Sequence, residues 1–543
     1  MPHVNRIEPA AYRDNNFFPF LFEIPFCSHA VIANILHIVR GTDMIKRMFK
    51  KIKEFLLTNR TTRQTVAKNT FWLTVSNVGG RLLRAIVIIY AARVLGAEQW
   101  GIFSYAITIV AVLTLFIDFG INAILIREAA RTPEKQRRLE ITSTSFFLKL
   151  GLLVIGVAIV LFIVPRFTTL SAAKTIFPIV AAILVFDTLR QFGFSIIQAT
   201  EKMEREAGLY FLTNLGIVAF GLAFLQFSRT VESFSYAYAI GTGIGMMATF
   251  YALRDSFKKV FTYFNPSLIK PILGACWPFA ISSLLGMFMI NTDILVIGWL
   301  KSATDVGIYS AANRIIQLLY IIPSIVAASA LPAFARLAVK DPIKMREALE
   351  RVVSLVFIIA LPAAVGGIIL GQPIMAGLFG ESFSPGTIAF QVLLLTILID
   401  FPAVILSSAL VAYDRQKNLI VYAAIGGGLN VLLDFLLIPR FGIAGSSVAT
   451  LIAQFVSNVY LWHTARSLIQ FEVLPHLKIA VFATLGVGIL TALFAALHLH
   501  FVAIVAIAAI AYLSLLLKLR DPLLRELFLI LRRDVSSEPT VRG

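Results

Sequence analysis

The sequence predicts an all-α polytopic membrane protein of about fourteen transmembrane helices, with two six-helix lobes and a C-terminal helix pair. Of its 543 residues, 58% are hydrophobic and 14% are charged, and the mean hydropathy is +0.84. Soluble domains carry about 25% charged residues. In addition, the stretch Ala97–Ala106 returns as Ala303–Ala312, with Ala, Gly, Ile, Ser and Ala in register. A membrane chain that repeats itself in this way is expected to contain two copies of one bundle, as many transporters do.

The apolar segments follow this plan in order, since crossing the hydrocarbon layer takes about 20 residues. The first lobe, 70–253, holds segments near 70–95, 101–126, 141–164, 175–199, 208–226 and 233–253. The second lobe, 271–462, holds segments near 271–300, 307–335, 352–370, 386–412, 419–437 and 443–462, and a terminal pair follows near 477–497 and 501–517. Each segment is apolar on nearly every face, which predicts helices in lipid and excludes the alternating strands of a barrel.

The two ends of the chain are expected to be cytoplasmic. Residues 1–69 form an N-terminal segment in which prolines interrupt a phenylalanine-rich stretch, so neither a spanning helix nor a signal peptide fits. Met44 then opens a basic amphipathic stretch, which makes residues 1–43 a candidate for sequence outside the natural start. Residues 518–543 form a tail.

Lysine and arginine predict the orientation in the membrane. They gather in the loops around 127–138, 254–259 and 336–351 and before the first span, whereas the alternate loops contain few. By the positive-inside rule both termini face the cytoplasm, and a multi-pass protein of the inner (cytoplasmic) membrane is expected. The net charge of +18 is spread over these loops and forms no basic patch on a polar domain, which excludes nucleic acid as the partner.

Several classes of enzyme site are missing from the sequence. It contains no Walker A loop, no His-Glu-x-x-His motif and no Cys/His metal cluster, and Cys27 and Cys276 are its only cysteines. No loop is long enough for a soluble catalytic domain. We therefore expect no enzyme activity and no cofactor, with an H⁺ or Na⁺ gradient or the membrane potential as the candidate energy source.

Ionisable and amide side chains inside the spans mark the candidate site, because such groups are costly in lipid and face a cavity or a partner. In the first span Asn77, Arg81 and Arg84 recur at helical spacing on one face. The candidate substrate-binding residues are Arg81, Arg84, Arg190, Arg314, Asn77, Asn313 and Gln317. The candidate ion-coupling residues are Asp118, Asp187, Asp293 and Asp400. Lys149 lies near enough to the inner end of its span to snorkel, and it is given little weight.

Two interpretations of these charges stay open. Asp118 with Arg81, Asp187 with Arg190 and Asp293 with Arg314 are possible structural pairs that hold helices together. Arg84, however, has no obvious carboxylate of its own. A guanidinium group without a carboxylate suits an anionic ligand, since arginine binds phosphate oxygens through a planar fork.

Several segments of the chain resemble the polysaccharide transporter family, which includes O-antigen flippases and belongs to the multidrug/oligosaccharidyl-lipid/polysaccharide flippase superfamily. The resemblance covers about residues 60–465. It is carried by Asn69–Trp72, Gly80–Arg84, Ala92–Gly101, Asp118–Asn122 and Arg127-Glu128.

The resemblance implies two lobes related by an axis along the membrane normal, around a cavity that opens alternately to each side. It also implies a lipid-linked oligosaccharide, usually on undecaprenyl pyrophosphate, that is flipped for surface polysaccharide biosynthesis, with polymerases or glycosyltransferases as candidate partners. The cationic cavity of the family matches Arg81, Arg84 and Arg314, and Arg190 matches it less well. The seventh span lacks an equivalent arginine.

Three alternatives remain open. The terminal pair is shared with peptidoglycan lipid II flippases, and a cation-coupled multidrug exporter belongs to the same superfamily, although the cavity arginines count against it. A membrane glycosyltransferase or polymerase usually needs a large outer loop with catalytic residues. The longest outer loop here, near 371–385, carries one acid, Glu381, and no basic residue.

Overall fold

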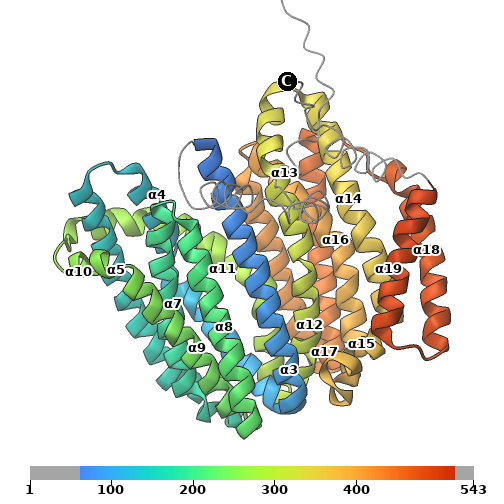
Figure 1. Ribbon diagram of the computed structural model, residues 1–543, viewed down its shortest axis with the longest axis horizontal. Helices are drawn as coiled ribbons and strands as arrows, with labels where there is room; N and C mark the ends of the chain where they lie inside the picture. The colour runs from blue at the N-terminus through green and yellow to red at the C-terminus, as the bar shows by residue number, and fades with distance from the viewer. Residues whose placement is uncertain (1–61, 520–543) are drawn as a thin grey trace, which may run out of the picture.

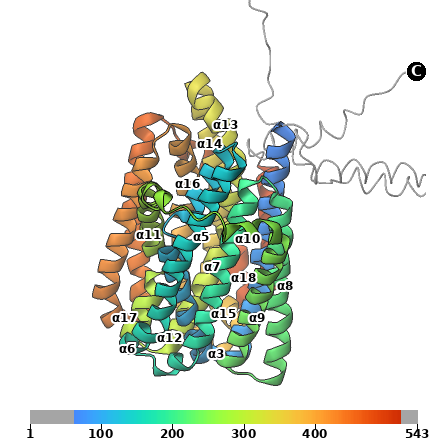
Figure 2. The same ribbon diagram turned by 90° about the vertical axis from the view of Figure 1, so that its left-hand side faces the viewer.

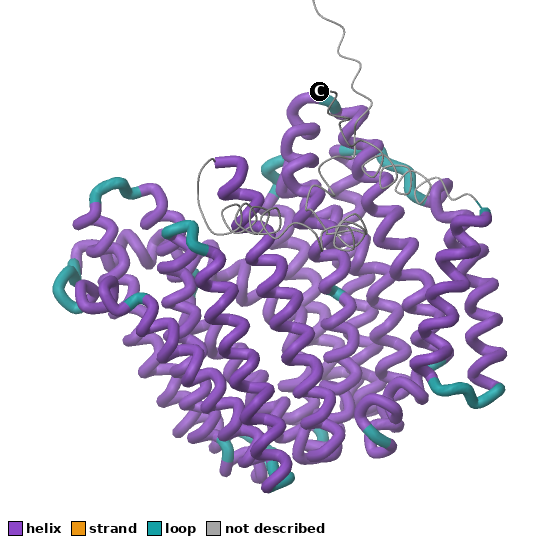
Figure 3. Tube along the Cα trace, in the orientation of Figure 1, coloured by secondary structure: helices purple, strands orange, loops and turns teal. Residues whose placement is uncertain are grey.

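The computed structural model describes residues 62–519, and every regular element in this range is helical (Figures 1 and 3). Most of the predicted segment 1–69, with the Met44 stretch, and most of the tail 518–543 lie outside the described residues.

The first half of the described chain folds into helices that pack side by side (Figure 2). Its elements are α3 (Thr62–Asp118), α4 (Ile121–Arg131), α5 (Lys135–Ala158), a π-helical turn (Ile159–Ile163), α6 (Val164–Phe167), a 3-10 turn (Ser171–Thr175), α7 (Phe177–Ala199), α8 (Met203–Phe227), α9 (Val231–Ala252) and α10 (Arg254–Val260). The π turn ends two residues before Pro165. Proline lacks the N–H that would continue the hydrogen bonds of an α-helix.

The second half continues from a 3-10 turn (Pro266–Leu268). Its elements are α11 (Ile269–Leu300), α12 (Ala303–Leu319), α13 (Ile321–Lys340), α14 (Pro342–Ile369), α15 (Gly371–Phe379), a 3-10 turn (Glu381–Gly386), α16 (Thr387–Ala412), α17 (Gln416–Leu468), α18 (Leu474–Ala496) and α19 (Phe501–Lys518). A capping box starts α12, because the Ser302 and Asp305 side chains each accept the backbone N–H of the other. The predicted outer loop 371–385 is folded into α15 and the turn after it.

Eleven helical segments between residues 62 and 519 are long and apolar enough to cross a membrane, so the protein is a multi-pass membrane protein. Two helices are long enough to cross the membrane twice. Helix α3 has 57 residues and α17 has 53, which at about 1.5 Å per residue far exceeds a hydrocarbon layer of about 30 Å. Each bends at a glycine with positive φ, Gly96 (74°) and Gly442 (58°), where a side chain would be strained. The total of fourteen spans and the two-lobe arrangement stay predictions.

The helices of the two halves meet at one end of the molecule and lean apart at the other (Figure 1). At the meeting end α12 packs against the second part of α3, and the two copies of the internal repeat lie in contact there. A methyl group on Gly101 would lie 1.7 Å from the carbonyl oxygen of Ala303, and one on Gly307 would lie 1.8 Å from that of Ala97. Only glycine allows backbones to approach so closely.

The buried apolar core runs through this contact. It extends from Val87 and Trp100 in the first half to Tyr309 and Phe390 in the second. Helices α18 and α19 form a smaller cluster against α14. Helix α11 contacts both halves, since Cys276 near its start packs with α4, whereas its end packs against α17.

Candidate substrate-binding cavity

A cavity of about 990 Å³ lies between the two halves, next to the contact of the two repeats. Its polar lining residues are Arg81 and Arg84 from α3, Tyr210 from α8, Asn291 and Asp293 from α11, Asn313, Arg314 and Gln317 from α12, Tyr320 directly after α12, Thr396, Asp400, Ser407 and Ser408 from α16, and Tyr422, Thr450 and Gln454 from α17. On both α3 and α12, the cavity lining ends before the repeat contact is reached. The residues between the lining and that contact pack the two halves against each other. The cavity is therefore closed at that end.

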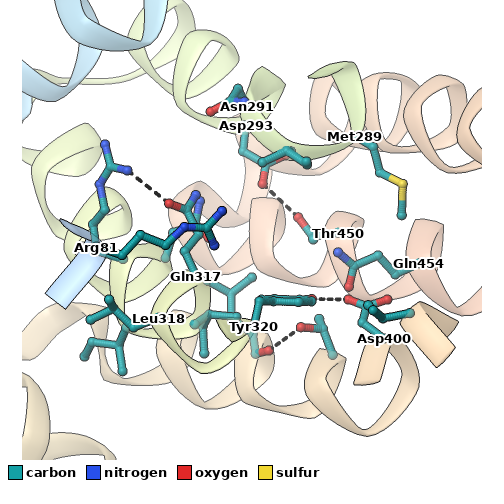
Figure 4. Close-up of a pocket in the computed structure, with 18 of the residues that line it drawn as sticks. Arg81, Met289, Asn291, Asp293, Gln317, Leu318, Tyr320, Asp400, Thr450 and Gln454 are labelled. Atoms are coloured by element: carbon teal, nitrogen blue, oxygen red, sulfur yellow. Dashed lines mark hydrogen bonds between the residues drawn. The ribbon is translucent and has the colours of Figure 1, made fainter. Parts of the chain in front are cut away.

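One wall of the cavity is basic. Figure 4 shows Arg81 and Gln317 on the side opposite Asp400 and Gln454. Arg314 donates a hydrogen bond to Gln317 at 3.0 Å. Among the described residues, none of the guanidinium groups of Arg81, Arg84 and Arg314 forms an ion pair with a carboxylate. Three positive charges without carboxylate partners in a cavity are suited to an anion.

Arg84 is held on this wall by side chains of α8. Its Nε donates to the Oδ1 of Asn214 at 3.1 Å, and its guanidinium carbon lies 6.0 Å from the centre of the Tyr210 ring. The terminal Nη groups of Arg84 have no protein partner among the described residues. Arg84 therefore enters the cavity with its outer nitrogens available to a ligand.

The opposite wall contains two carboxylates, each in a hydrogen-bonded setting. Asp400 accepts hydrogen bonds from the hydroxyl of Tyr320 and from the Nδ2 of Asn458, the latter at 2.9 Å. Asp293 accepts from the hydroxyl of Tyr309 and from Thr450, the latter at 3.0 Å. The possible structural pair of Asp293 with Arg314 is not among the ion pairs of residues 62–519.

Behind Asp293 lies a buried polar cluster formed by α11, α12 and α17. Asp434 lies next to Asp293 and accepts a hydrogen bond from Ser446 at 3.0 Å. Three buried oxygens of the cluster have no hydrogen-bond donor within residues 62–519: Asp293 Oδ1, Asp434 Oδ2 and Asn430 Oδ1. Buried carboxyl oxygens without donors are costly, and a proton or a bound cation would satisfy them.

Two of the predicted carboxylates lie away from the cavity lining. Asp187 forms an ion pair with Arg190 and accepts from Gln191 at 2.7 Å, as expected for a structural pair. Arg190 is buried and packs over Phe194 and Tyr210. Tyr210 lines the cavity, whereas Arg190 does not.

Asp118 contradicts two expectations. Its partner is Lys149, with Nζ to Oδ1 at 2.7 Å, instead of Arg81. Lys149 does not snorkel to the surface; its side chain is 2% exposed and also donates to Asn122 at 2.8 Å. A carboxylate on the neighbouring helix makes burial of the amine cheaper than extension to the interface. Asn77 lies on α3 as predicted, but its side chain is outside the described set.

The sequence reasoning missed the buried tyrosines and Asn214. Tyr309 and Tyr320 bind the two cavity carboxylates, and Tyr210 supports Arg84. A tyrosine hydroxyl inside an apolar span requires a partner, so these tyrosines could have been paired with the neighbouring carboxylates.

The comparisons with known proteins agree with this architecture. A family model described as "Polysaccharide biosynthesis protein" matches residues 66–338, half of the chain, and a second model, MatE, matches 278–436. "Probable low-salt glycan biosynthesis flippase Agl15" of Haloferax volcanii is 23% identical, with 75% of this chain and 85% of the relative covered. "Capsular polysaccharide biosynthesis protein CapF" of Staphylococcus aureus is 20% identical, with 73% and 98% covered.

Among solved structures, the lipid II flippase MurJ in an inward closed conformation has the same fold. The TM-score is 0.67 at 16% identity, with 82% of this chain and 98% of that chain covered. The chain thus belongs to the polysaccharide biosynthesis protein family, the polysaccharide transporters of the multidrug/oligosaccharidyl-lipid/polysaccharide flippase superfamily.

Proposed function

We propose that this protein is a flippase that carries a lipid-linked oligosaccharide, built on undecaprenyl pyrophosphate, across the cytoplasmic membrane for surface polysaccharide biosynthesis. The single observation that carries the proposal is the basic wall of the cavity, where Arg81, Arg84 and Arg314 face a shared space without carboxylate partners. The names of the relatives Agl15 and CapF support the class of substrate.

The substrate has three chemically different parts that need different surroundings. The pyrophosphate is suited to the three arginines, and the sugars to the amide and hydroxyl groups of the opposite wall. The polyprenyl tail is costly to pull through a polar cavity, whereas the head group is costly to drag through lipid. A lateral opening between the lobes would let the tail stay in the bilayer while the head group crosses.

The arrangement in the membrane follows from the basic loops. We propose fourteen spans in two six-helix lobes with a terminal pair, both termini in the cytoplasm, and the repeat contact at the outer side. The cavity, closed at the repeat contact, is then poised to receive substrate from the cytoplasmic side. Glycosyltransferases that build the glycan and a polymerase that uses it are the proposed functional partners.

The energy source is proposed to be a cation gradient that acts through the second lobe. Of the four candidate carboxylates, Asp118 and Asp187 already have cationic partners. Asp400 has a donor on each of its two oxygens, whereas both donors of Asp293 reach the same oxygen, Oδ2. Asp293 adjoins a second carboxylate, Asp434, and in the described part of the chain one oxygen of each lacks a donor. An H⁺ or Na⁺ at this pair would remove the repulsion between them.

A flipping assay tests the proposal. The purified protein is placed in liposomes with a fluorescent undecaprenyl-pyrophosphate oligosaccharide, and a membrane-impermeant quencher reports the fraction exposed outside. The proposal expects protein-dependent equilibration of the labelled lipid. Absence of flipping, together with efflux of a cationic dye from the same liposomes, would instead establish the exporter alternative. Faster flipping of lipid II would establish the peptidoglycan alternative.

A further inference from the structure

We propose that Gly80, Tyr210 and Asn214, which we term the Arg84 support, position Arg84 so that its two Nη groups present a fork to the phosphate of the substrate. This inference deepens the proposed function and rests on it. The support residues act through Arg84 and need not touch the ligand.

The first part of the argument is the hydrogen bond between Arg84 and Asn214. Asn214 is fully buried on α8, and its Oδ1 accepts the Nε–H of Arg84 at 3.1 Å. Its Nδ2 is fixed in turn, since it donates to the backbone carbonyl of Tyr210 at 2.8 Å. Asn214 therefore has one orientation, with its oxygen toward Arg84. A fixed acceptor on Nε leaves the four N–H donors of the Nη groups for other partners.

The second part is the aromatic ring beside the guanidinium group. Tyr210 lines the cavity, and its ring centre lies 6.0 Å from the guanidinium carbon of Arg84 and 5.8 Å from that of Arg190. The ring thus lies close to one cation of the cavity wall and to one buried cation. Contact with an aromatic ring favours an arginine that has been withdrawn from water.

The third part is the glycine that makes room for both residues. Gly80 lies one turn before Arg84 on α3, and a methyl group there would come within 2.2 Å of the Tyr210 ring and 3.0 Å of the Asn214 Nδ2. The neighbouring Gly79 has no such constraint, because a methyl group on it would meet no atom within 4 Å. Of the two adjacent glycines, only Gly80 is required by the approach of α8 to α3.

Together these contacts reduce the conformational freedom of a long, flexible side chain before the ligand arrives. A preorganised fork binds phosphate oxygens with less loss of side-chain entropy than a mobile one. The Arg84 support should therefore set the affinity for the anionic group and leave binding of the sugars unchanged.

The test measures binding of undecaprenyl pyrophosphate to the full-length protein in nanodiscs. Asn214→Leu keeps the branched shape of the side chain and removes the acceptor, and it should weaken binding about tenfold. Gly80→Ala displaces Tyr210 and Asn214 and should weaken binding by a similar factor. The matched controls are Gly79→Ala, on the same helix, and Thr213→Val, next to Asn214. The Thr213 hydroxyl donates to the backbone carbonyl of Leu209 in the same helix. Both controls should bind within about twofold of wild type.

A double variant separates positioning from a general structural role. If Asn214 acts through Arg84, then Asn214→Leu should have less than about a twofold effect when Arg84→Ala is already present. An equal effect in both backgrounds would overturn the proposal. Wild-type affinity of both Asn214→Leu and Gly80→Ala would also overturn the proposal. If Arg84→Ala binds weakly in that experiment, the proposed function stays intact. A wild-type protein that does not bind the probe would instead contradict the proposed function itself.

Discussion

Ser310 donates a hydrogen bond to Ser104 across the two halves of the molecule, with 3.1 Å between their Oγ atoms. The two serines occupy the same position in the two copies of the repeat, three residues after Gly101 and Gly307 respectively. Each glycine in turn packs against the alanine that precedes the other by four residues. Reciprocal contacts of this kind are expected around a two-fold axis, so the axis relating the predicted lobes should pass through this point.

The first prediction is a reversible lock at this contact. Replacement of Ser104 and Ser310 by Cys places two thiols where the hydroxyls now bond, within reach of a disulfide. If the lobes separate here during transport, oxidation should stop flipping and a reductant should restore it. The single variants Ser104→Cys and Ser310→Cys are the controls, in a background without Cys27 and Cys276. An oxidised, cross-linked protein that still flips substrate at the wild-type rate would show that this end stays closed throughout the cycle.

The second prediction concerns the stability of the same contact. Gly101→Ala or Gly307→Ala would place a methyl group within 2 Å of a backbone carbonyl, so the helices must separate, at a cost of about 1–3 kcal/mol. We expect a lower melting temperature in detergent for either variant. Gly366→Ala is the control, because a methyl group there meets no atom within 4 Å. Equal melting temperatures for all three would refute the close approach.

The third prediction concerns the buried pair of Lys149 and Asp118. Lys149→Met removes the amine and leaves the carboxylate without its cation, which should destabilise the protein by about 3–5 kcal/mol. The double variant Lys149→Met/Asp118→Asn should recover much of that loss, because no unpaired charge is left. Chemical denaturation of the purified protein measures both. Full stability of Lys149→Met would mean that Asp118 has another partner.

How far the sequence predicts this structure differs between features. The repeat at Gly101 and Gly307 predicted a break between helices before each copy, since its register is visible in the printed letters. The chain does bend at Gly96 in α3, and α11 ends at Leu300. The sequence did not show that the two copies touch each other, because contacts between segments 206 residues apart depend on how the helices pack. Lys149 was misjudged for the same reason: its depth suggested snorkelling, and only the neighbouring helix reveals Asp118 as its partner.

The candidate site was predicted in part. The helical spacing of Arg81 and Arg84 and the cluster from Asn313 to Gln317 placed these residues on faces that do line the cavity. Arg190 shares their chemistry but is buried outside the cavity lining, in contact with Tyr210. Periodicity gives the face of a helix, and it cannot say whether another side chain stands between that face and the cavity.

The fourth prediction concerns ion coupling. Neutralising Asp293 or Asp434 to Asn should abolish the dependence of flipping on an imposed H⁺ or Na⁺ gradient, because the paired carboxylates would no longer need a cation. Asp118→Asn and Asp187→Asn should keep the dependence, since those groups are neutralised by protein cations. Asp400→Asn should keep it as well. Flipping assays with and without the gradient decide between them, and full dependence in every variant would rule out all these carboxylates as the coupling site.

The fifth prediction concerns Arg84 and is the most direct test of the account. The rate of flipping of a labelled undecaprenyl-pyrophosphate oligosaccharide is measured for wild type, Arg84→Lys and Arg84→Ala at equal amounts of inserted protein. Lysine keeps the charge but loses the planar fork, so the rate should fall about threefold, whereas alanine loses both and should lower it by more than about tenfold. An inserted Arg84→Ala protein that flips the substrate as fast as wild type would contradict the assignment of this cavity to the pyrophosphate.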